Sequence, residues 1–173
     1  MKIGVSGHQK RDCIDWDWVR ISIRQILIEN KVSTAFSSLA VGSDQIFAAE
    51  AIALGIPVEA VIPFSDYDRC FSALNLQDYR ELLKKASNQI FINKQGDDER
   101  LFFEAGKKVC ELSELMVFIW DGKPSFGKGG TADIVNVAAE FGRSFVWLNP
   151  ILRERRDSFG PKQWCRSEPV STF

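Results

Sequence analysis

The sequence has no excess of charge of one sign, and this limits the partners that it attracts. Its 22 Lys and Arg residues and 23 Asp and Glu residues leave a formal net charge of −1 at pH 7. A chain without a global positive field does not hold a nucleic-acid backbone or an anionic membrane by charge alone. The balance therefore argues against a long nucleic acid or a membrane as partner, and we expect any anionic ligand to be held by a few local groups.

Cysteine, histidine and long apolar runs are also scarce. The four cysteines lie far apart without a CxxC or Cys/His spacing, and His8 is the only histidine. This pattern argues against a zinc site, so we predict no bound metal or cofactor, and it is typical of a protein from a reducing cytosol. No apolar stretch reaches the roughly 20 residues that cross a bilayer. We therefore expect a cytoplasmic protein.

What the sequence does contain is a regular alternation of strand-like and helix-like segments. Short apolar runs rich in β-branched and aromatic residues alternate with longer stretches whose apolar residues recur at helical spacing. Strands that are continuously apolar indicate a doubly wound α/β domain, with a mostly parallel sheet and helices on both faces. The predicted strands are Lys2–Ser6, Thr34–Ala40, Val58–Ile62, Gln89–Ile92, Leu115–Trp120 and Ser144–Leu148. The predicted helices are Ile14–Glu29, Asp44–Leu54, Gln77–Ala86, Asp98–Glu111 and Gly130–Phe141.

The domain organisation follows from the point at which this alternation stops. The chain has 173 residues, 45% of them apolar and 26% charged, which suits one globular domain. Residues 1–150 carry the alternating segments and are predicted to form that domain. Residues 151–173 are polar, include Pro161 and Pro169, and are predicted to be a C-terminal tail on the surface.

Small and polar residues follow three of the predicted strands. In an open α/β sheet, ligands bind beyond the carboxyl ends of the strands, so these residues are predicted to share one edge of the sheet. Trp120 ends the strand before the third junction, near enough to this edge to stack on a base. The candidate ligand-binding residues at the three junctions are Gly7, His8 and Gln9; Gly42, Ser43 and Asp44; and Asp121, Gly122 and Lys123.

The third junction continues into a glycine-rich turn directly before a helix. Gly127, Gly129 and Gly130 allow close backbone approach beside the exposed N–H groups of a helix N-terminus, which attract an anion. Lys128 adds positive charge, and the hydroxyl of Thr131 is a further donor. We therefore predict a phosphate-binding loop, although its spacing matches neither the GxxxxGK[ST] of a P-loop nor the GxGxxG of a dinucleotide fold. A glycine-rich turn without a ligand is the alternative.

Several of these residues have a structural explanation beside the functional one. Asp44 is placed either to cap its helix or to accept hydrogen bonds from a ribose. Gly42 and Ser43 suit a tight turn as well as a ligand contact. His8 either reaches the cleft or lies in a solvated loop, and Asp121 either accepts from a ligand hydroxyl or caps its own loop.

The three junctions together resemble the SLOG superfamily of Rossmann-like domains. The resemblance rests on GHQ, on GSDQ and, most specifically, on the segment WDGKPSFGKGGTADIV, and it covers roughly Met1–Pro150. This superfamily gathers the Smf/DprA proteins, the LOG phosphoribohydrolases and nucleotide-sensing domains. The resemblance implies a Rossmann-like sheet that binds a nucleotide or an NAD-like, ADP-ribose-like or cyclic nucleotide molecule, as a sensor or signalling module. It further implies that the turn at Gly127–Thr131 holds phosphate and that the GSD loop lies near the sugar.

The resemblance also leaves an enzymatic alternative open. The phosphoribohydrolases share a pattern similar to PGGxGTxxE, whose glutamate helps to cleave an N-glycosidic bond. When Thr131 is laid on that threonine, the glutamate position falls on Ile134, which can do no acid–base work. A nucleotide N-glycoside hydrolase or transferase would then depend on Asp133, Asp44 or Asp121 as its catalytic carboxylate. A structural subunit with a vestigial site is the third hypothesis.

One predicted helix bears on the oligomeric state. The helix over Asp98–Glu111 contains Leu101, Phe102, Phe103 and Val109, which give it more apolar surface than one face of a helix usually needs. We therefore expect a homodimer that forms through this helix.

Overall fold

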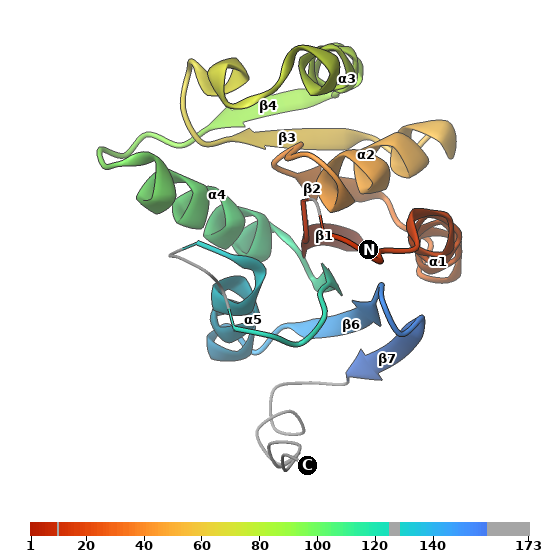
Figure 1. The fold of residues 1–173 in the computed structure, drawn as a ribbon. Helices are drawn as coiled ribbons and strands as arrows, with labels where there is room; N and C mark the ends of the chain where they lie inside the picture. The colour runs from red at the N-terminus through yellow and green to blue at the C-terminus, as the bar shows by residue number, and fades with distance from the viewer. Residues whose placement is uncertain (10, 125–128, 159–173) are drawn as a thin grey trace.

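The computed structural model describes residues 1–9, 11–124 and 129–158. Within these ranges, the strands form one sheet in the order β4-β3-β2-β1-β5-β6-β7 (Figure 1). Neighbours from β4 to β6 are parallel, whereas β7 pairs with β6 in the antiparallel direction. The strands are β1 (Lys2–Gly7), β2 (Thr34–Ser37), β3 (Val58–Ile62), β4 (Asn88–Phe91), β5 (Leu115–Ile119), β6 (Ser144–Asn149) and β7 (Glu154–Ser158). The helices are α1 (Trp16–Glu29), α2 (Ser43–Ala53), the short 3-10 helix η1 (Tyr67–Cys70), α3 (Ala73–Lys85), α4 (Asp98–Leu112) and α5 (Thr131–Glu140).

The doubly wound, mostly parallel Rossmann-like sheet predicted from the sequence is confirmed. Helices α1, α2 and α3 cover one face of the sheet, and α4 and α5 cover the other (Figure 1). Each predicted strand and helix corresponds to an element of the structure, although some ends differ by a few residues. In the described part of the chain, no helix has the length and apolar character that a membrane span needs.

The core forms two layers because the side chains of each strand alternate between the faces of the sheet. Every residue of β5 is buried. Its odd-numbered residues belong to the layer beneath α1, α2 and α3, whereas Met116 and Phe118 belong to the layer beneath α4 and α5. A strand buried on both faces has no place for a charged side chain, which explains the uncharged run in the sequence.

The starts of the helices divide them into two kinds. The carboxylate of Asp15 accepts a hydrogen bond from the Trp18 N–H at 2.9 Å and caps α1, and Asp97 caps α4 in the same way through Arg100. Helices α2 and α5 instead have glycine at the N-cap, and no side chain in the described ranges caps them. Their first backbone N–H groups are therefore left for other partners.

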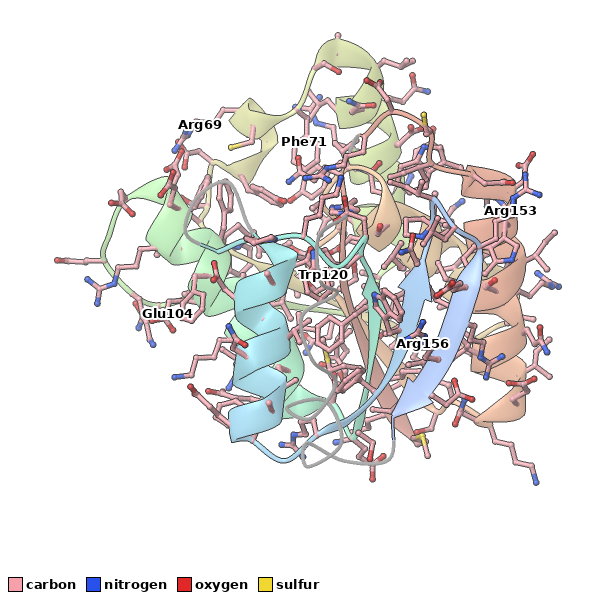
Figure 2. All side chains as sticks on the ribbon, turned by 60° about the horizontal axis from the view of Figure 1, so that its bottom comes forward. Arg69, Phe71, Glu104, Trp120, Arg153 and Arg156 are labelled. Atoms are coloured by element: carbon pink, nitrogen blue, oxygen red, sulfur yellow. The ribbon has the colours of Figure 1, made fainter. Side chains whose placement is uncertain are left out.

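The segment after β6 differs from the expectation. A polar tail is predicted over residues 151–173, but Glu154–Ser158 form β7 at the edge of the sheet. Arg156 lies on β7 (Figure 2), and its guanidinium lies over the ring of Trp147, 5.1 Å from the ring centre. The sequence pattern hides this strand because it has charged residues where the other strands are apolar, which suits an exposed edge. The rest of the predicted tail, residues 159–173, lies outside the described residues.

The apolar residues of α4 are used within the chain. Leu101 and Val109 are buried. Phe102 packs against the core layer beneath α1, α2 and α3, whereas Phe103 packs against the layer beneath α4 and α5. The apolar residues of α4 are thus explained by packing within one chain, without a second copy of the protein. The homodimer stays a prediction, and the composition of this helix no longer supports it.

Candidate functional site

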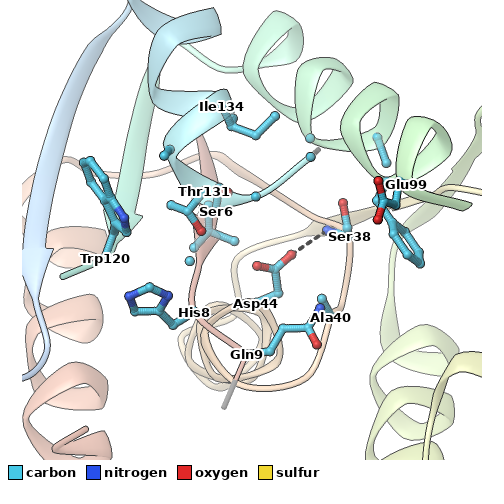
Figure 3. A pocket seen from close by; sticks show the side chains of 18 of the residues that line it. Ser6, His8, Gln9, Ser38, Ala40, Asp44, Glu99, Trp120, Thr131 and Ile134 are labelled. Atoms are coloured by element: carbon cyan, nitrogen blue, oxygen red, sulfur yellow. Dashed lines mark hydrogen bonds between the residues drawn. The ribbon is translucent and has the colours of Figure 1, made fainter. Parts of the chain in front are cut away.

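A cleft of about 520 Å³ opens beyond the carboxyl ends of β1, β2, β3 and β5. This is the edge at which the sequence analysis places its polar junctions. His8 and Trp120 lie on one side of the cleft, Glu99 lies on the other, and Asp44 lies between them (Figure 3). The predicted site residues that line the cleft are Gly7, His8, Gln9, Asp44, Lys123, Gly129, Gly130 and Thr131.

The other predicted site residues do not line the cleft or lie outside the described residues. The described residues among them that do not line the cleft are Gly42, Ser43, Asp121, Gly122 and Asp133. Gly127 and Lys128 fall in the range that the structure does not describe. The contribution of these two residues to a phosphate-binding loop therefore stays a prediction.

Close packing of the turn after β1 on the start of α2 forms one wall. The carbonyl oxygen of His8 accepts hydrogen bonds from the N–H of Ser43 at 3.1 Å and from its hydroxyl at 2.8 Å. Gly42 has a φ of 89°, and a Cβ there would overlap the carbonyl oxygen of Gln9. A Cβ on Gly7 would lie 2.6 Å from the hydroxyl oxygen of Ser43. Of the two explanations left open for Gly42 and Ser43, the structure supports the tight turn.

Asp44 does not cap α2, because Gly42 occupies the N-cap position. The Asp44 carboxylate instead accepts hydrogen bonds from the Ser38 N–H at 3.1 Å and from the Ser37 hydroxyl at 3.3 Å, and so holds the loop after β2. Burial raises the pKa of Asp44 to about 7, although the hydrogen bonds that it accepts favour the charged form. A carboxyl group that lines the cleft can therefore be protonated near neutral pH.

His8 and Asp121 hold the other wall together. The imidazole Nε2 of His8 accepts a hydrogen bond from the Asp121 backbone N–H at 3.1 Å, and Arg11 forms an ion pair with the Asp121 carboxylate. Burial lowers the pKa of His8, and Arg11 lowers it further, while Asp121 opposes both. The neutral ring is the form whose Nε2 can accept. His8 thus lines the cleft as an uncharged group, which resolves its two alternatives in favour of the cleft.

The Asp121 side chain caps its own loop. Its Oδ1 accepts from the N–H of Lys123 at 3.2 Å. Burial raises the pKa of Asp121, but this hydrogen bond and the neighbouring Arg11 oppose burial, and the pKa lies below its ordinary value. Asp121 is therefore a charged group of the wall, with only 3% of its side chain exposed.

Hydrogen bonds hold Trp120 at its indole N–H and at its backbone carbonyl oxygen. Its indole N–H donates to the carbonyl oxygen of Lys123 at 2.7 Å, and its own carbonyl oxygen accepts from the indole N–H of Trp147 at 2.8 Å. These bonds pin the loop that carries Lys123 to the end of β5. Trp120 lines the cleft but is only 8% exposed, so a base would meet little of its ring.

The turn before α5 approaches the backbone of α4 closely. Gly129 has a φ of 87°, and a Cβ there would lie 3.0 Å from the carbonyl oxygen of Glu99. The N–H of Gly129 donates to the carboxylate of Asp133 at 2.9 Å, so this donor is used within the chain. Gly130 is the N-cap, and Thr131 begins the helix at the cleft. The anion-binding potential predicted for this turn therefore rests on the N–H groups that follow Gly129.

Ile134 occupies the position of the glutamate in the phosphoribohydrolase pattern. It is 1% exposed, and its Cδ1 lies 2.7 Å from where a Cβ on Gly106 would be. The side chain thus fills the contact between α5 and α4 at the edge of the cleft. Asp133, one residue earlier, is engaged with Gly129 and does not line the cleft.

The side of the cleft that follows β3 was not predicted from the sequence. Pro63, directly after β3, marks a fourth junction at the same edge and is the signal that was available. No element was predicted between Ile62 and Gln77, but this segment forms η1 and the start of α3. The cleft-lining residues that were not predicted include Ser6, Arg11, Ser38, Tyr67, Glu99 and Phe102.

Comparison with known proteins identifies the fold. No family model and no curated protein matches the chain. Among solved structures, DNA processing protein A from Helicobacter pylori, described for its single-stranded DNA binding, is 16% identical with a TM-score of 0.61, over 89% of this chain and 67% of that one. DNA processing protein A from Streptococcus pneumoniae is 18% identical with a TM-score of 0.61, over 86% of this chain and 50% of that one. The molybdenum cofactor carrier protein from Chlamydomonas reinhardtii is 16% identical with a TM-score of 0.54, over 85% of this chain and 75% of that one.

These similarities show the fold alone, and it is the Rossmann-like fold that the resemblance implied. The chain spans about half the length of the Streptococcus pneumoniae protein. The expectation that argued against a long nucleic acid as partner is wrong, because a protein with this fold binds single-stranded DNA. Net charge describes the whole protein, whereas a single-stranded nucleic acid is held by local groups along one surface of it. A net charge of −1 therefore does not exclude a nucleic acid.

The burial of Asp44 predicts a pH dependence of stability. An aspartate in the unfolded chain ionises near pH 4, whereas Asp44 in the folded protein ionises near pH 7. Between these values the folded state binds the extra proton, so the free energy of unfolding falls as the pH rises and this contribution is lost above pH 7. Asp44→Asn keeps an acceptor oxygen but cannot titrate. Urea unfolding between pH 4.5 and 7.5 should give the variant a shallower decline, by up to about 1.4 kcal/mol per pH unit; equal slopes would contradict the assignment.

The contact between Gly129 and α4 predicts a difference between two glycine substitutions. Gly129 and Gly55 both have a positive φ, so alanine at either position costs about 1–2 kcal/mol of left-handed backbone strain. Nothing lies within 4 Å of a Cβ on Gly55, whereas a Cβ on Gly129 meets the backbone of α4. Gly129→Ala should therefore lower the free energy of unfolding more than Gly55→Ala in urea. A loss no larger than that of the Gly55 control would show that α4 does not brace the turn.

Proposed function

We propose that the cleft binds a nucleotide or a nucleotide-derived small molecule, with its phosphate at the N-terminus of α5. The observation that carries the proposal is an uncapped helix start beside hydroxyls without partners. Ser6 and Thr131 both line the cleft, and neither hydroxyl has a hydrogen-bond partner among the described residues. Backbone N–H groups at a helix N-terminus, supplemented by hydroxyl donors, are suited to phosphate oxygens.

The local charges support the same proposal. Lys123 lines the cleft together with the α5 N-terminus, so a positive charge is available there although the chain as a whole is nearly neutral. Arg11 also lines the cleft, but its charge is paired with Asp121. His8 contributes a neutral polar surface to the same cleft. We propose a sensor or signalling module rather than an enzyme, because Ile134 stands where the phosphoribohydrolase pattern has the glutamate that helps to cleave the N-glycosidic bond.

A nucleotide is also the repeating unit of a single-stranded nucleic acid. The DNA processing protein from Helicobacter pylori binds single-stranded DNA with this fold. The ligand panel for this cleft therefore contains both forms: ribonucleoside 5′-monophosphates, NAD, ADP-ribose, cyclic nucleotides and short single-stranded oligonucleotides.

Removal of the Thr131 hydroxyl tests the position of the phosphate. Thr131→Val should weaken calorimetric binding of AMP about tenfold, because one hydrogen bond to a charged oxygen is lost, and should leave binding of adenosine unchanged. Thr34→Val is the matched control, since Thr34 begins β2 and does not line the cleft. If AMP is not bound at millimolar concentration, the same comparison is made with the member of the panel that binds best and its form without phosphate.

Two results would contradict the proposal. One is the absence of binding by every member of the panel. The other is a Thr131→Val variant that binds the phosphorylated and unphosphorylated forms with equally reduced affinity, since the hydroxyl would then not contact phosphate.

An N-glycoside hydrolase or transferase that acts on a nucleotide is the second candidate function. Asp44 favours it, because a carboxyl group with a pKa of about 7 that lines the cleft can donate a proton to a departing base. Asp133 and Asp121 are weaker candidates, since neither lines the cleft and each accepts a backbone hydrogen bond.

Chromatography for released base tests the enzymatic candidate. Incubation of micromolar protein with nucleoside monophosphates and NAD over several hours should release base, and Asp44→Asn should abolish that release while the protein still binds the nucleotide. No release by the unaltered protein excludes this function for these substrates and leaves the binding proposal intact.

A further inference from the structure

Tyr67 places a fixed hydroxyl in the cleft on the side that follows β3. The residue is only 5% exposed and lines the cleft, yet its hydroxyl has no hydrogen-bond partner among the described residues. Aromatic neighbours hold the ring edge-on: the centroid of Phe71 lies 4.9 Å away, that of Tyr79 5.5 Å and that of Phe64 5.6 Å. The protein thus leaves this hydroxyl without a hydrogen bond of its own, and a ligand group in the cleft can form one.

Tyr67 and Asp44 form a donor and an acceptor at the same end of the cleft. Burial, and then the nearby Asp44, raise the pKa of Tyr67 well above its ordinary value, so the hydroxyl keeps its proton. The two side chains are close enough to influence each other electrostatically, but no hydrogen bond joins them in the structure. A group that both donates and accepts would satisfy the pair.

The order of the strands gives a length scale for the ligand. Parallel neighbours lie about 4.8 Å apart, and β5, β1, β2 and β3 are consecutive in the sheet. Thr131 follows β5, and Ser6 is the last residue but one of β1; Asp44 follows β2 and Tyr67 follows β3. From the α5 N-terminus, the cleft therefore presents first the phosphate donors that follow β5 and β1, and then Asp44 and Tyr67, which follow the strands two and three spacings from β5.

Apolar groups also line the cleft. Pro63 and Phe102 are two of them, and the ring of Phe102 has its centroid 6.0 Å from that of Tyr67. In a nucleotide the sugar lies between the phosphate and the base. The cleft thus contains phosphate donors, a hydroxyl-binding pair and an apolar surface, which are the groups that the three parts of a nucleotide need.

We propose that the Tyr67 hydroxyl, together with Asp44, holds the vicinal hydroxyls of a ribose and makes the cleft select ribonucleotides over deoxyribonucleotides. This inference rests on the nucleotide-binding function proposed above. A sugar hydroxyl donates to Asp44 and accepts from Tyr67 at once, and a ribose presents two such groups. A deoxyribose leaves one nearly buried partner unsatisfied, which is the physical basis of strong discrimination between otherwise similar ligands.

Tyr67→Phe removes the hydroxyl and leaves the aromatic cluster in place. Binding of the best-bound ribonucleoside 5′-monophosphate, of its 2′-deoxy form and of its 3′-deoxy form is measured by calorimetry on the full chain. The unaltered protein should bind at least one deoxy form about tenfold more weakly, as expected for one lost hydrogen bond. Tyr67→Phe should bind the ribonucleotide about tenfold more weakly and should lose that preference.

Tyr79→Phe is the matched control. Tyr79 belongs to the same aromatic cluster, stacked on Phe71 with centroids 4.4 Å apart, but it does not line the cleft. This variant should keep both the affinity and the preference of the unaltered protein. A loss of preference in Tyr79→Phe as well would assign the effect to the cluster and overturn the role of the Tyr67 hydroxyl.

Three other outcomes overturn the inference. Equal binding of the ribonucleotide and both deoxy forms by the unaltered protein would remove the sugar preference while leaving nucleotide binding intact. A Tyr67→Phe variant that keeps the preference would show that another group selects the sugar. Failure of every nucleotide to bind would remove the proposed function itself and this inference with it.

Discussion

The parallel pairing of β1 with both β2 and β5 is the constraint on which the rest of the cleft depends. Gly4, in the middle of β1, pairs with Phe36 on one side and with Met116 on the other. Because parallel strands end at the same edge, the loops that follow these three strands converge, and β3 brings a fourth beside them. The two buried layers hold this register, since a shift of one residue would turn each strand's apolar side chains to the wrong layer.

The polar groups around the cleft divide into those with partners in the chain and those without. Backbone and carboxylate groups of the walls are bonded to one another: His8 with Ser43 and Asp121, Asp44 with the loop after β2, and Asp133 with Gly129. By contrast, hydroxyls that face the cavity from β1, η1 and α5 have no partner among the described residues. A rigid frame with unsatisfied donors at its surface is suited to binding a polar ligand without a large rearrangement.

The sequence was sufficient to predict the fold because each buried strand is an unbroken apolar run and each helix has helical spacing. It failed for β7, whose charged residues suit an edge strand and carry no such signal. It located most of the cleft for the same topological reason, since ligands bind at the carboxyl ends of parallel strands. The sequence could not show that Gly42, Ser43 and Asp121 lie behind the surface of the cleft rather than on it, because this depends on how closely two backbone segments approach each other. Tyr67 was missed because its place in the cleft depends on how the segment after β3 folds back over the sheet.

The proposed function requires that the cleft hold a nucleotide unit with its phosphate at the start of α5. The most direct measurement is a crystal structure of the protein grown with the best-bound ribonucleoside 5′-monophosphate. Phosphate oxygens should lie within hydrogen-bond distance of the Thr131 N–H and hydroxyl, with the sugar toward Asp44. A nucleotide bound elsewhere, such as in the groove that Trp16 and Gln45 line between α1, α2 and α3, or with its phosphate remote from α5, would contradict it.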